Sequence, residues 1–86
     1  MANLEKHGVP FDEAVTIFLD PDALDGPDLQ HSSHERRFRR LGRSADGRLL
    51  MVVYTQRRAG NAETIRLISA RRASRQERAA YAKAED

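Results

Sequence analysis

Arginine is the residue whose number and spacing in this chain could do chemistry. Lys6 and Lys83 are the only lysines among the 15 basic residues, so the others are arginines. Two apolar runs, 49–55 and 64–70, each lead into an arginine pair, at 57–58 and 71–72. A guanidinium group binds phosphate through two parallel hydrogen bonds and stacks on bases, whereas lysine acts mainly as a point charge. The pattern fits binding of a polyanion and fits equally well a solvated basic surface left by an arginine-rich coding bias.

Groups that could move a proton lie elsewhere in the chain. His7, next to Lys6, titrates near neutral pH and could act as an acid or a base. A histidine just before Gly8 could equally satisfy the last carbonyls of a helix. Glu35 and Arg37 share one side of an extended segment, either as a base beside its phosphate clamp or as an ordinary ion pair. Both alternatives stay open for each pair.

A metal site is not expected. Asp28, His31 and His34 have the side-chain types of zinc ligands, but the sequence offers no convincing fourth ligand beside them. The absence of cysteine excludes disulfides and thiolate ligands, and it fits a reducing compartment. We therefore expect no metal and no cofactor.

The net charge of +2 hides a strong segregation along the chain. Residues 1–35 carry one lysine against eight carboxylates, a net −7, and residues 36–86 carry fourteen basic residues against five carboxylates, a net +9. The second half should therefore face the polyanion. The length of 86 residues fits one domain over 1–86. Because no apolar segment reaches the ~18 residues of a membrane span and the N-terminus has no apolar signal region, we expect a cytoplasmic protein.

The elements that must position the arginines lie mostly in this basic half. The runs 49–55 and 64–70 are rich in Val, Ile, Leu, Tyr and Thr, and a loop with Gly60 and Asn61 separates them, which predicts two adjacent antiparallel strands. The first run is apolar at consecutive positions, as in a central strand covered on both faces. In the second run, regular alternation puts the odd-numbered residues 65–71 on one face and Arg66 with Ile68 on the other. The register between the two strands stays open.

The remaining segments predict an α+β fold, with N-terminal helices, an antiparallel sheet of about four strands and a C-terminal helix. The expected elements are the end of a helix at 3–7, a helix from Pro10 to Leu19 with Phe11, Val15, Phe18 and Leu19 on its buried face, an edge strand at 23–28, a charged strand at 35–41, a hairpin turn at 44–47, and a helix from the Ser74-x-x-Glu77 capping box to about Ala84.

Three short segments, taken together, carry a resemblance. They are Lys-His-Gly at 6–8, Phe-x-Asp-Pro at 18–21 and Ile-Ser-Ala-Arg at 68–71. In their order and spacing, and over nearly its whole length, the chain resembles the BrnT family, the toxin half of bacterial BrnT/BrnA toxin–antitoxin systems. The other matching residues are Asn3, Phe11, Asp28, His31, Glu35, Arg37, Gly42, Arg43, Gly47, Arg48, Thr55, Arg57, Ala73, Glu77 and Tyr81.

The resemblance implies a fold similar to RelE-type ribonuclease toxins and ribosome-independent cleavage of RNA. It also implies neutralisation by a BrnA antitoxin that carries a ribbon-helix-helix DNA-binding domain, with operator DNA bound only through the complex. Family members usually begin with an aromatic-Asp-x-x-Lys segment that this chain lacks before Asn3. We therefore expect a single BrnT-like toxin domain with a truncated first helix.

Cleavage of RNA without a metal needs a base for the 2′-hydroxyl proton, cations for the dianionic phosphorane and an acid for the leaving 5′-oxygen. Arg57 and Arg71 match the family's Thr-x-Arg and Ser-x-Arg positions and are the first choice for the cations. Their structural alternative is an exposed ion pair or the cap of a strand. Tyr81 could stack a base, or could simply dock the last helix together with Glu77. The candidate catalytic residues are Arg57, Arg71, Glu35, Lys6 and His7, and the candidate RNA-binding residues are Arg37, Arg43, Arg58, Arg72 and Tyr81.

Two functions follow from these residues. The first is an endoribonuclease toxin that inhibits translation by cleaving mRNA on a basic sheet face and is held inactive by its antitoxin. The second is a non-catalytic subunit that uses the same face to bind an acidic antitoxin or nucleic acid within an autorepressing complex. Self-association, as a homodimer or within a heterotetramer, stays open, since the acidic first half could cover the basic half of a second copy.

Overall fold

A computed structural model describes residues 8–29 and 36–85 of the chain. The predicted helix end at 3–7 and the predicted site residues Lys6, His7 and Glu35 lie outside these ranges. The described chain runs α2 (Phe11–Ala14), η1 (Val15–Leu19), β1 (Leu24–Pro27), β2 (Phe38–Arg43), β3 (Leu49–Ala59), β4 (Ala62–Arg72) and α3 (Arg75–Glu85). The α+β class expected from the sequence is confirmed, whereas the likeness to RelE-type toxins stays a prediction.

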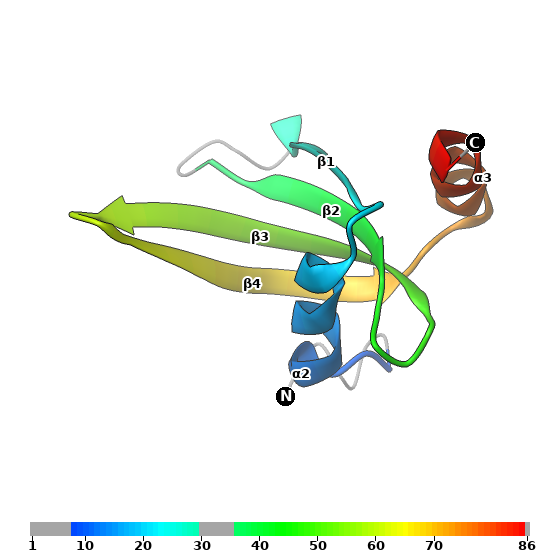
Figure 1. The fold of residues 1–86 in the computed structure, drawn as a ribbon, viewed down its shortest axis with the longest axis horizontal. Coiled ribbons are helices and arrows are strands. Elements are labelled where there is room, and N and C mark those ends of the chain that lie inside the picture. The colour runs from blue at the N-terminus through cyan, green and yellow to red at the C-terminus, as the bar shows by residue number, and fades with distance from the viewer. Residues whose placement is uncertain (1–7, 30–35, 86) are drawn as a thin grey trace.

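The four strands form one antiparallel sheet in the order β1-β2-β3-β4 (Figure 1). The edge strand expected at 23–28 is confirmed as β1. The charged strand expected at 35–41 instead covers Phe38–Arg43, because pairing with β3 continues through Gly42↔Leu50 and Arg43↔Leu49 up to the turn at residues 44–48. Gly47, with φ 87°, supplies the left-handed backbone of that turn, as the Asp-Gly signal predicted.

The helix predicted from Pro10 to Leu19 is wrong in its second half. Only Phe11–Ala14 is α-helical, and Val15–Leu19 forms a 3₁₀ helix. The β-branched run Val15-Thr16-Ile17 disfavours the α-helix, and the Thr16 hydroxyl donates to the carbonyl of Glu13 at 2.6 Å. Three residues per turn bring Ala14 and Ile17 onto the sheet. Val15 and Leu19, predicted to be buried, are therefore 50% and 83% exposed.

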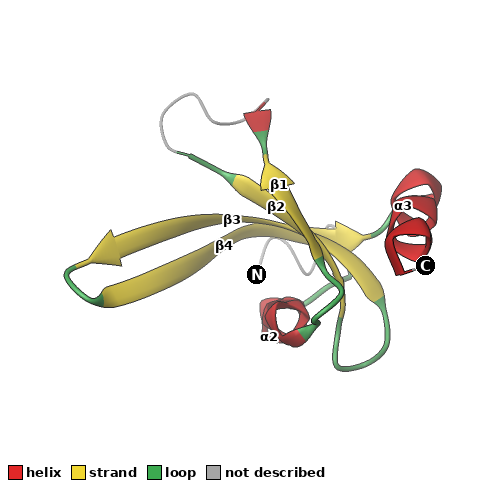
Figure 2. Ribbon diagram, turned by 45° about the horizontal axis from the view of Figure 1, so that its top comes forward, coloured by secondary structure: helices red, strands yellow, loops and turns green. Residues whose placement is uncertain are grey.

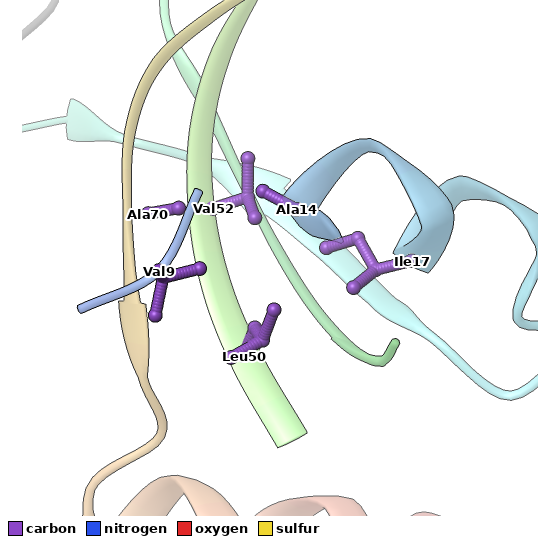
Figure 3. Packing of buried hydrophobic residues seen from close by; sticks show 6 residues of the cluster. All are labelled: Val9, Ala14, Ile17, Leu50, Val52 and Ala70. Carbon is purple, nitrogen blue, oxygen red and sulfur yellow. The ribbon is translucent and has the colours of Figure 1, made fainter. Parts of the chain in front are cut away.

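This short helical segment and the sheet enclose the main core. Figure 3 shows Val9, Ala14 and Ile17 meeting residues of β3 and β4 on one face of the sheet. Phe11, Phe18 and Leu67 pack around this cluster. Gly42 permits the close approach, because a Cβ there would lie 3.1 Å from the Cβ of Ile17. The buried cluster consists of Val9, Ala14, Ile17, Leu50, Val52 and Ala70.

A second cluster lies on the opposite face, at the end of the sheet where α3 docks. It joins Leu41 and Met51 of the sheet with Ala73 and Tyr81. The capping box predicted for this helix is confirmed, since the amide of Ser74 donates to Glu77 Oε1 at 2.8 Å and the amide of Glu77 donates to Ser74 Oγ at 3.2 Å. The first half of β3 is thus covered on both faces, as its continuous apolar run predicted.

The other half of the β3–β4 hairpin projects beyond the rest of the sheet, at the end away from α3 (Figures 1 and 2). Strand β2 pairs with β3 only from Leu49 to Tyr54, so residues 55–59 are paired with β4 alone. Gly60, with φ 62°, is the first central residue of the two-residue turn that joins Ala59 to Ala62. The predicted hairpin is confirmed, with strands longer than the apolar runs.

A β-bulge changes which side chains of β4 share a face. Val53 pairs with Ser69 but Tyr54 pairs with Leu67, so Ile68 is an extra residue. Regular alternation predicted Leu67 on the face of Ser69 and Arg71, with Arg66 opposite, and this is wrong. Leu67 packs against the main core, and Arg66 lies on the face of Ser69 and Arg71.

Candidate nucleic-acid interface

The face of the sheet opposite α2 and η1 carries a groove of about 450 Å³. We call this side of the sheet the arginine face, because three guanidinium groups, those of Arg37, Arg39 and Arg71, line the groove. Apolar residues, one hydroxyl residue and one carboxylate residue complete the lining. The remaining lining residues are Asp28, Met51, Val53, Ile68 and Ser69.

Strand register places two of these arginines on either side of β3. Arg39 of β2 pairs with Val53, and Arg71 of β4 pairs with Met51. Residues 51 and 53 point to the same face, so Arg39 and Arg71 flank β3 two strand spacings apart and offset by two residues, roughly 12 Å between Cα atoms. A phosphate lying over β3 would thus have a guanidinium group on each side.

Arg71 is held in place by the last helix. Its Nη1 and Nη2 donate to Glu77 Oε1 and Oε2 at 2.8 and 2.9 Å, and Nη1 also donates to the carbonyl of Arg72 at 3.2 Å. The hydrogen bond to Glu77 raises the pKa of Arg71, and the hydrogen bond from Arg71 lowers the pKa of Glu77 to about 2. Glu77 is therefore a weak base at neutral pH. The side chain of Arg71 is still 42% exposed, so its free edge can meet a ligand.

Asp28 supplies the carboxylate of the groove. It follows β1 directly, is 4% exposed, and its amide donates to the carbonyl of Arg37 at 2.8 Å. This bond ties the end of β1 to the residue that precedes β2. Among the described residues Asp28 is the one carboxylate in the groove lining, so the groove holds a carboxyl group among its arginines.

Arg57 does not reach this groove. It pairs with Thr64 near the hairpin turn, six residues along β3 from Met51, which is roughly 20 Å. Arg57 and Arg71, both first choices from the sequence, are therefore on the same face but far apart. Arg58 points to the other face, with Nη2 at 3.8 Å from Glu63 Oε2.

A second arginine cluster surrounds a depression of about 340 Å³ between the β2–β3 turn and α3. Arg43 and Arg72, both predicted to bind RNA, lie here rather than in the groove. Arg48 is already engaged by Glu13 through Nε at 2.9 Å and a second ion-pair contact from Nη2. We regard the groove as the better candidate site because its lining includes Asp28, whereas among the described residues no carboxylate lines the depression. The arginines around the depression are Arg43, Arg48, Arg72 and Arg78.

Tyr81 is placed as a packing residue. Its side chain is 3% exposed, and its hydroxyl donates to Asp20 Oδ2 at 2.7 Å. The guanidinium of Arg43 lies over the ring at 5.3 Å from its centroid. These contacts favour the structural alternative, docking of the last helix, over stacking on a base.

Sequence reasoning missed four residues that belong to the arginine face. Arg39 shares a face with Arg37 by simple alternation, and this signal was available. Arg66 was assigned to the wrong face because an unseen bulge shifts the alternation. Ser69 shares a face with Arg71 by alternation, as predicted, but it was not considered as a site residue. Asp28, weighed only as a metal ligand, gains its position from the backbone bond that ties the end of β1 to Arg37. His31 and His34, considered as metal ligands with Asp28, lie outside the described residues, and in the part that is described no three metal-ligating side chains gather.

The fold and this face define a small α+β protein with an arginine-lined groove on one face of its sheet. A comparison with protein families matches residues 1–77 to the ribonuclease toxin BrnT of type II toxin–antitoxin systems. The chain belongs to the BrnT family, as its motifs indicated, and the family has ribonuclease activity and an antitoxin partner. A comparison with curated proteins gave no match. Within the described ranges no helix is long and apolar enough to cross a membrane.

Proposed function

We propose that this chain is an endoribonuclease toxin that cleaves RNA in the groove of the arginine face without a metal ion. The observation that carries the proposal is the convergence of Arg37, Arg39 and Arg71 on one groove that also contains Asp28. Preorganised guanidinium groups stabilise the charge that develops on phosphorus oxygens without reorganising during the reaction. The bond to Glu77 gives Arg71 this preorganisation.

In the proposed reaction the ribose 2′-oxygen attacks the adjacent phosphorus while a base takes its proton. The dianionic phosphorane that forms is stabilised by Arg39 and Arg71. The P–O5′ bond then breaks, an acid protonates the departing 5′-oxygen, and the products are a 2′,3′-cyclic phosphate and a 5′-hydroxyl. For the two proton transfers the sequence offers Lys6, His7 and Glu35, and the groove adds Asp28.

The test is cleavage of a labelled single-stranded RNA in EDTA by the parent, Arg71→Ala and Glu77→Gln. The two variants remove the same ion pair, but only Glu77→Gln keeps the guanidinium group. Comparing them therefore separates a role of Arg71 in the reaction from its support of α3. We expect parental cleavage that leaves a 2′,3′-cyclic phosphate, a loss of about 10²-fold or more in Arg71→Ala, and less than about tenfold in Glu77→Gln.

Equal losses in the two variants would show that Arg71 acts only by bracing the helix. Absence of parental cleavage, with salt-sensitive RNA binding retained, would favour the alternative of a non-catalytic subunit. Cleavage by the parent that requires added magnesium would contradict the metal-independent reaction.

For regulation, we propose a BrnA-type antitoxin with a ribbon-helix-helix domain as the partner, with operator DNA bound through that domain. A net charge of +9 in residues 36–86 suits an acidic antitoxin segment. Competition between purified antitoxin and RNA for the arginine face tests this proposal. An antitoxin that binds without displacing RNA would contradict it.

A further inference from the structure

The arginine face continues from the groove onto the projecting part of the β3–β4 hairpin. Beyond Tyr54 this hairpin has no third strand among the described residues, and residues 56–66 are exposed. Figures 1 and 2 show it reaching away from the rest of the sheet. A two-stranded ribbon of this length contributes little to the core, because it buries almost no side chains. Stability of the core therefore does not explain the exposed charges of this ribbon.

The bulge at Ile68 decides which of these charges share the face of the groove. Since Ile68 is the extra residue, Arg66 pairs with Thr55 and Arg57 pairs with Thr64, all on the face of Ser69. Without the extra residue, Arg66 would point toward the side of α2. The irregularity thus adds Arg66 to a row that runs from the groove toward the turn.

The two faces of the ribbon differ in how their charge is balanced. On the opposite face, Arg58 lies beside Glu63 at 3.8 Å. On the arginine face, Arg57 and Arg66 have threonines as their cross-strand neighbours. Among the described residues, neither Arg57 nor Arg66 lies within ion-pair distance of a carboxylate. The arginine face of the ribbon therefore carries uncompensated positive charge.

We infer that this ribbon is a binding arm for the RNA backbone flanking the scissile phosphate, with Arg66 and Arg57 as its phosphate contacts. The inference rests on the proposed function, because it takes the groove as the place where the RNA is cleaved. From Met51 to Arg57 the row spans roughly 20 Å, the length of about six stacked nucleotides at 3.4 Å each. The arm contributes affinity for longer RNAs and no sequence selection, since guanidinium–phosphate contacts read no bases.

The test measures affinity for an uncleavable RNA, a 2′-O-methyl 20-mer, over a range of salt concentrations. Removing one arginine that binds a phosphate should reduce the slope of log affinity against log salt by about 0.7. We expect Arg66→Ala and Arg57→Ala to show this reduction. Arg58, a candidate RNA contact from the sequence, lies on the opposite face of the ribbon beside Glu63, and we do not propose it as a contact. Arg58→Ala is therefore the matched control, because it removes the same charge from the same ribbon and should leave the slope nearly unchanged.

Two variants that each add one arginine to the ribbon provide a second test. Thr64→Arg adds a charge to the arginine face beside Arg57, and Gln56→Arg adds the same charge to the other face. We expect Thr64→Arg to steepen the salt slope by about 0.7 and Gln56→Arg to have a smaller effect. Both sites are exposed, as are those of Arg57, Arg58 and Arg66, so circular dichroism should show unchanged folding.

The outcomes separate the arm from the ribonuclease reaction, since an uncleavable ligand reports binding alone. Slopes that fall equally in Arg66→Ala, Arg57→Ala and Arg58→Ala would overturn the arm, because they would indicate non-specific attraction. Weaker antitoxin binding in Arg66→Ala with an unchanged RNA slope would overturn it in favour of a protein contact. A face-specific effect without any cleavage by the parent would support the arm while contradicting the enzyme.

Discussion

Arg71 and Glu77 face each other across the junction of sheet and helix, joined by two parallel hydrogen bonds of 2.8 and 2.9 Å. Glu77 Oε1 also accepts the amide of Ser74. One carboxylate thus completes the cap of α3 and fixes an arginine of the groove. The position of the proposed phosphate ligand therefore depends on the docking of the last helix.

The first prediction concerns acid stability. Lowering the pKa of a carboxyl from 4.5 to about 2 corresponds to roughly 3 kcal/mol, which screening of the partly exposed Arg71 reduces to about 1–2 kcal/mol. Because the folded-state pKa is depressed, this stability is present above pH 4.5 and is lost as the pH falls toward 2. Urea unfolding of Glu77→Gln should show that loss at pH 7 and a flatter decline in acid. Glu63→Gln, which removes the exposed ion pair with Arg58, should show the same urea unfolding as the parent.

The second prediction concerns the close approach of η1 to β2. Gly42→Ala should destabilise the fold by about 1–3 kcal/mol, since the new Cβ would lie 3.1 Å from the Cβ of Ile17 and 3.2 Å from that of Ala23. Gly26→Ala is the control in the neighbouring strand, where a Cβ meets nothing within 4 Å. Equal midpoints of urea unfolding for the two variants would contradict the tight contact.

The third prediction concerns alkaline pH. Burial, together with the hydrogen bond to Asp25 Oδ1 at 2.9 Å, raises the pKa of Tyr54 to about 12. Because the neutral form is favoured in the folded state, this contribution is present below pH 10 and is lost as the pH rises toward 12. Ultraviolet titration of the parent and Tyr54→Phe should assign the late ionisation to Tyr54. Tyrosinate formation near pH 10 by both tyrosines of the folded protein would disprove this.

The fourth prediction concerns a groove residue that sequence reasoning passed over. Arg39→Ala should reduce RNA cleavage about 10²-fold, as expected when one preorganised charge donor is removed from a transition state, with little change in stability because Arg39 is exposed. Lys83→Ala, which removes an exposed charge from α3, should retain parental activity. A change in Arg39→Ala confined to KM would instead indicate ground-state binding.

The sequence predicted the order of the elements and failed where chain geometry departs from ideal periods. Continuous apolar residues identified β3 as central, and Gly60 identified the hairpin, because these signals are local. The 3₁₀ segment was missed since the choice between three and 3.6 residues per turn depends on packing of Ile17 against Gly42. The separation of Arg57 from Arg71 was predictable, because both lie toward the C-terminal ends of adjacent antiparallel strands, which point in opposite directions. The face of Arg66 was not predictable, because it depends on a bulge that alternation alone does not specify.

Because of the bulge at Ile68, the directions of the β4 side chains depend on the number of residues in the strand. This single unpaired residue determines which face of the ribbon each side chain between it and the hairpin turn occupies. Losing one residue there would turn Arg66 toward the core side and Leu67 toward water, although composition would barely change. One residue added between Gly60 and Asn61 would lengthen only the loop. Insertions and deletions should therefore be tolerated at the tip of this hairpin and not midway along β4.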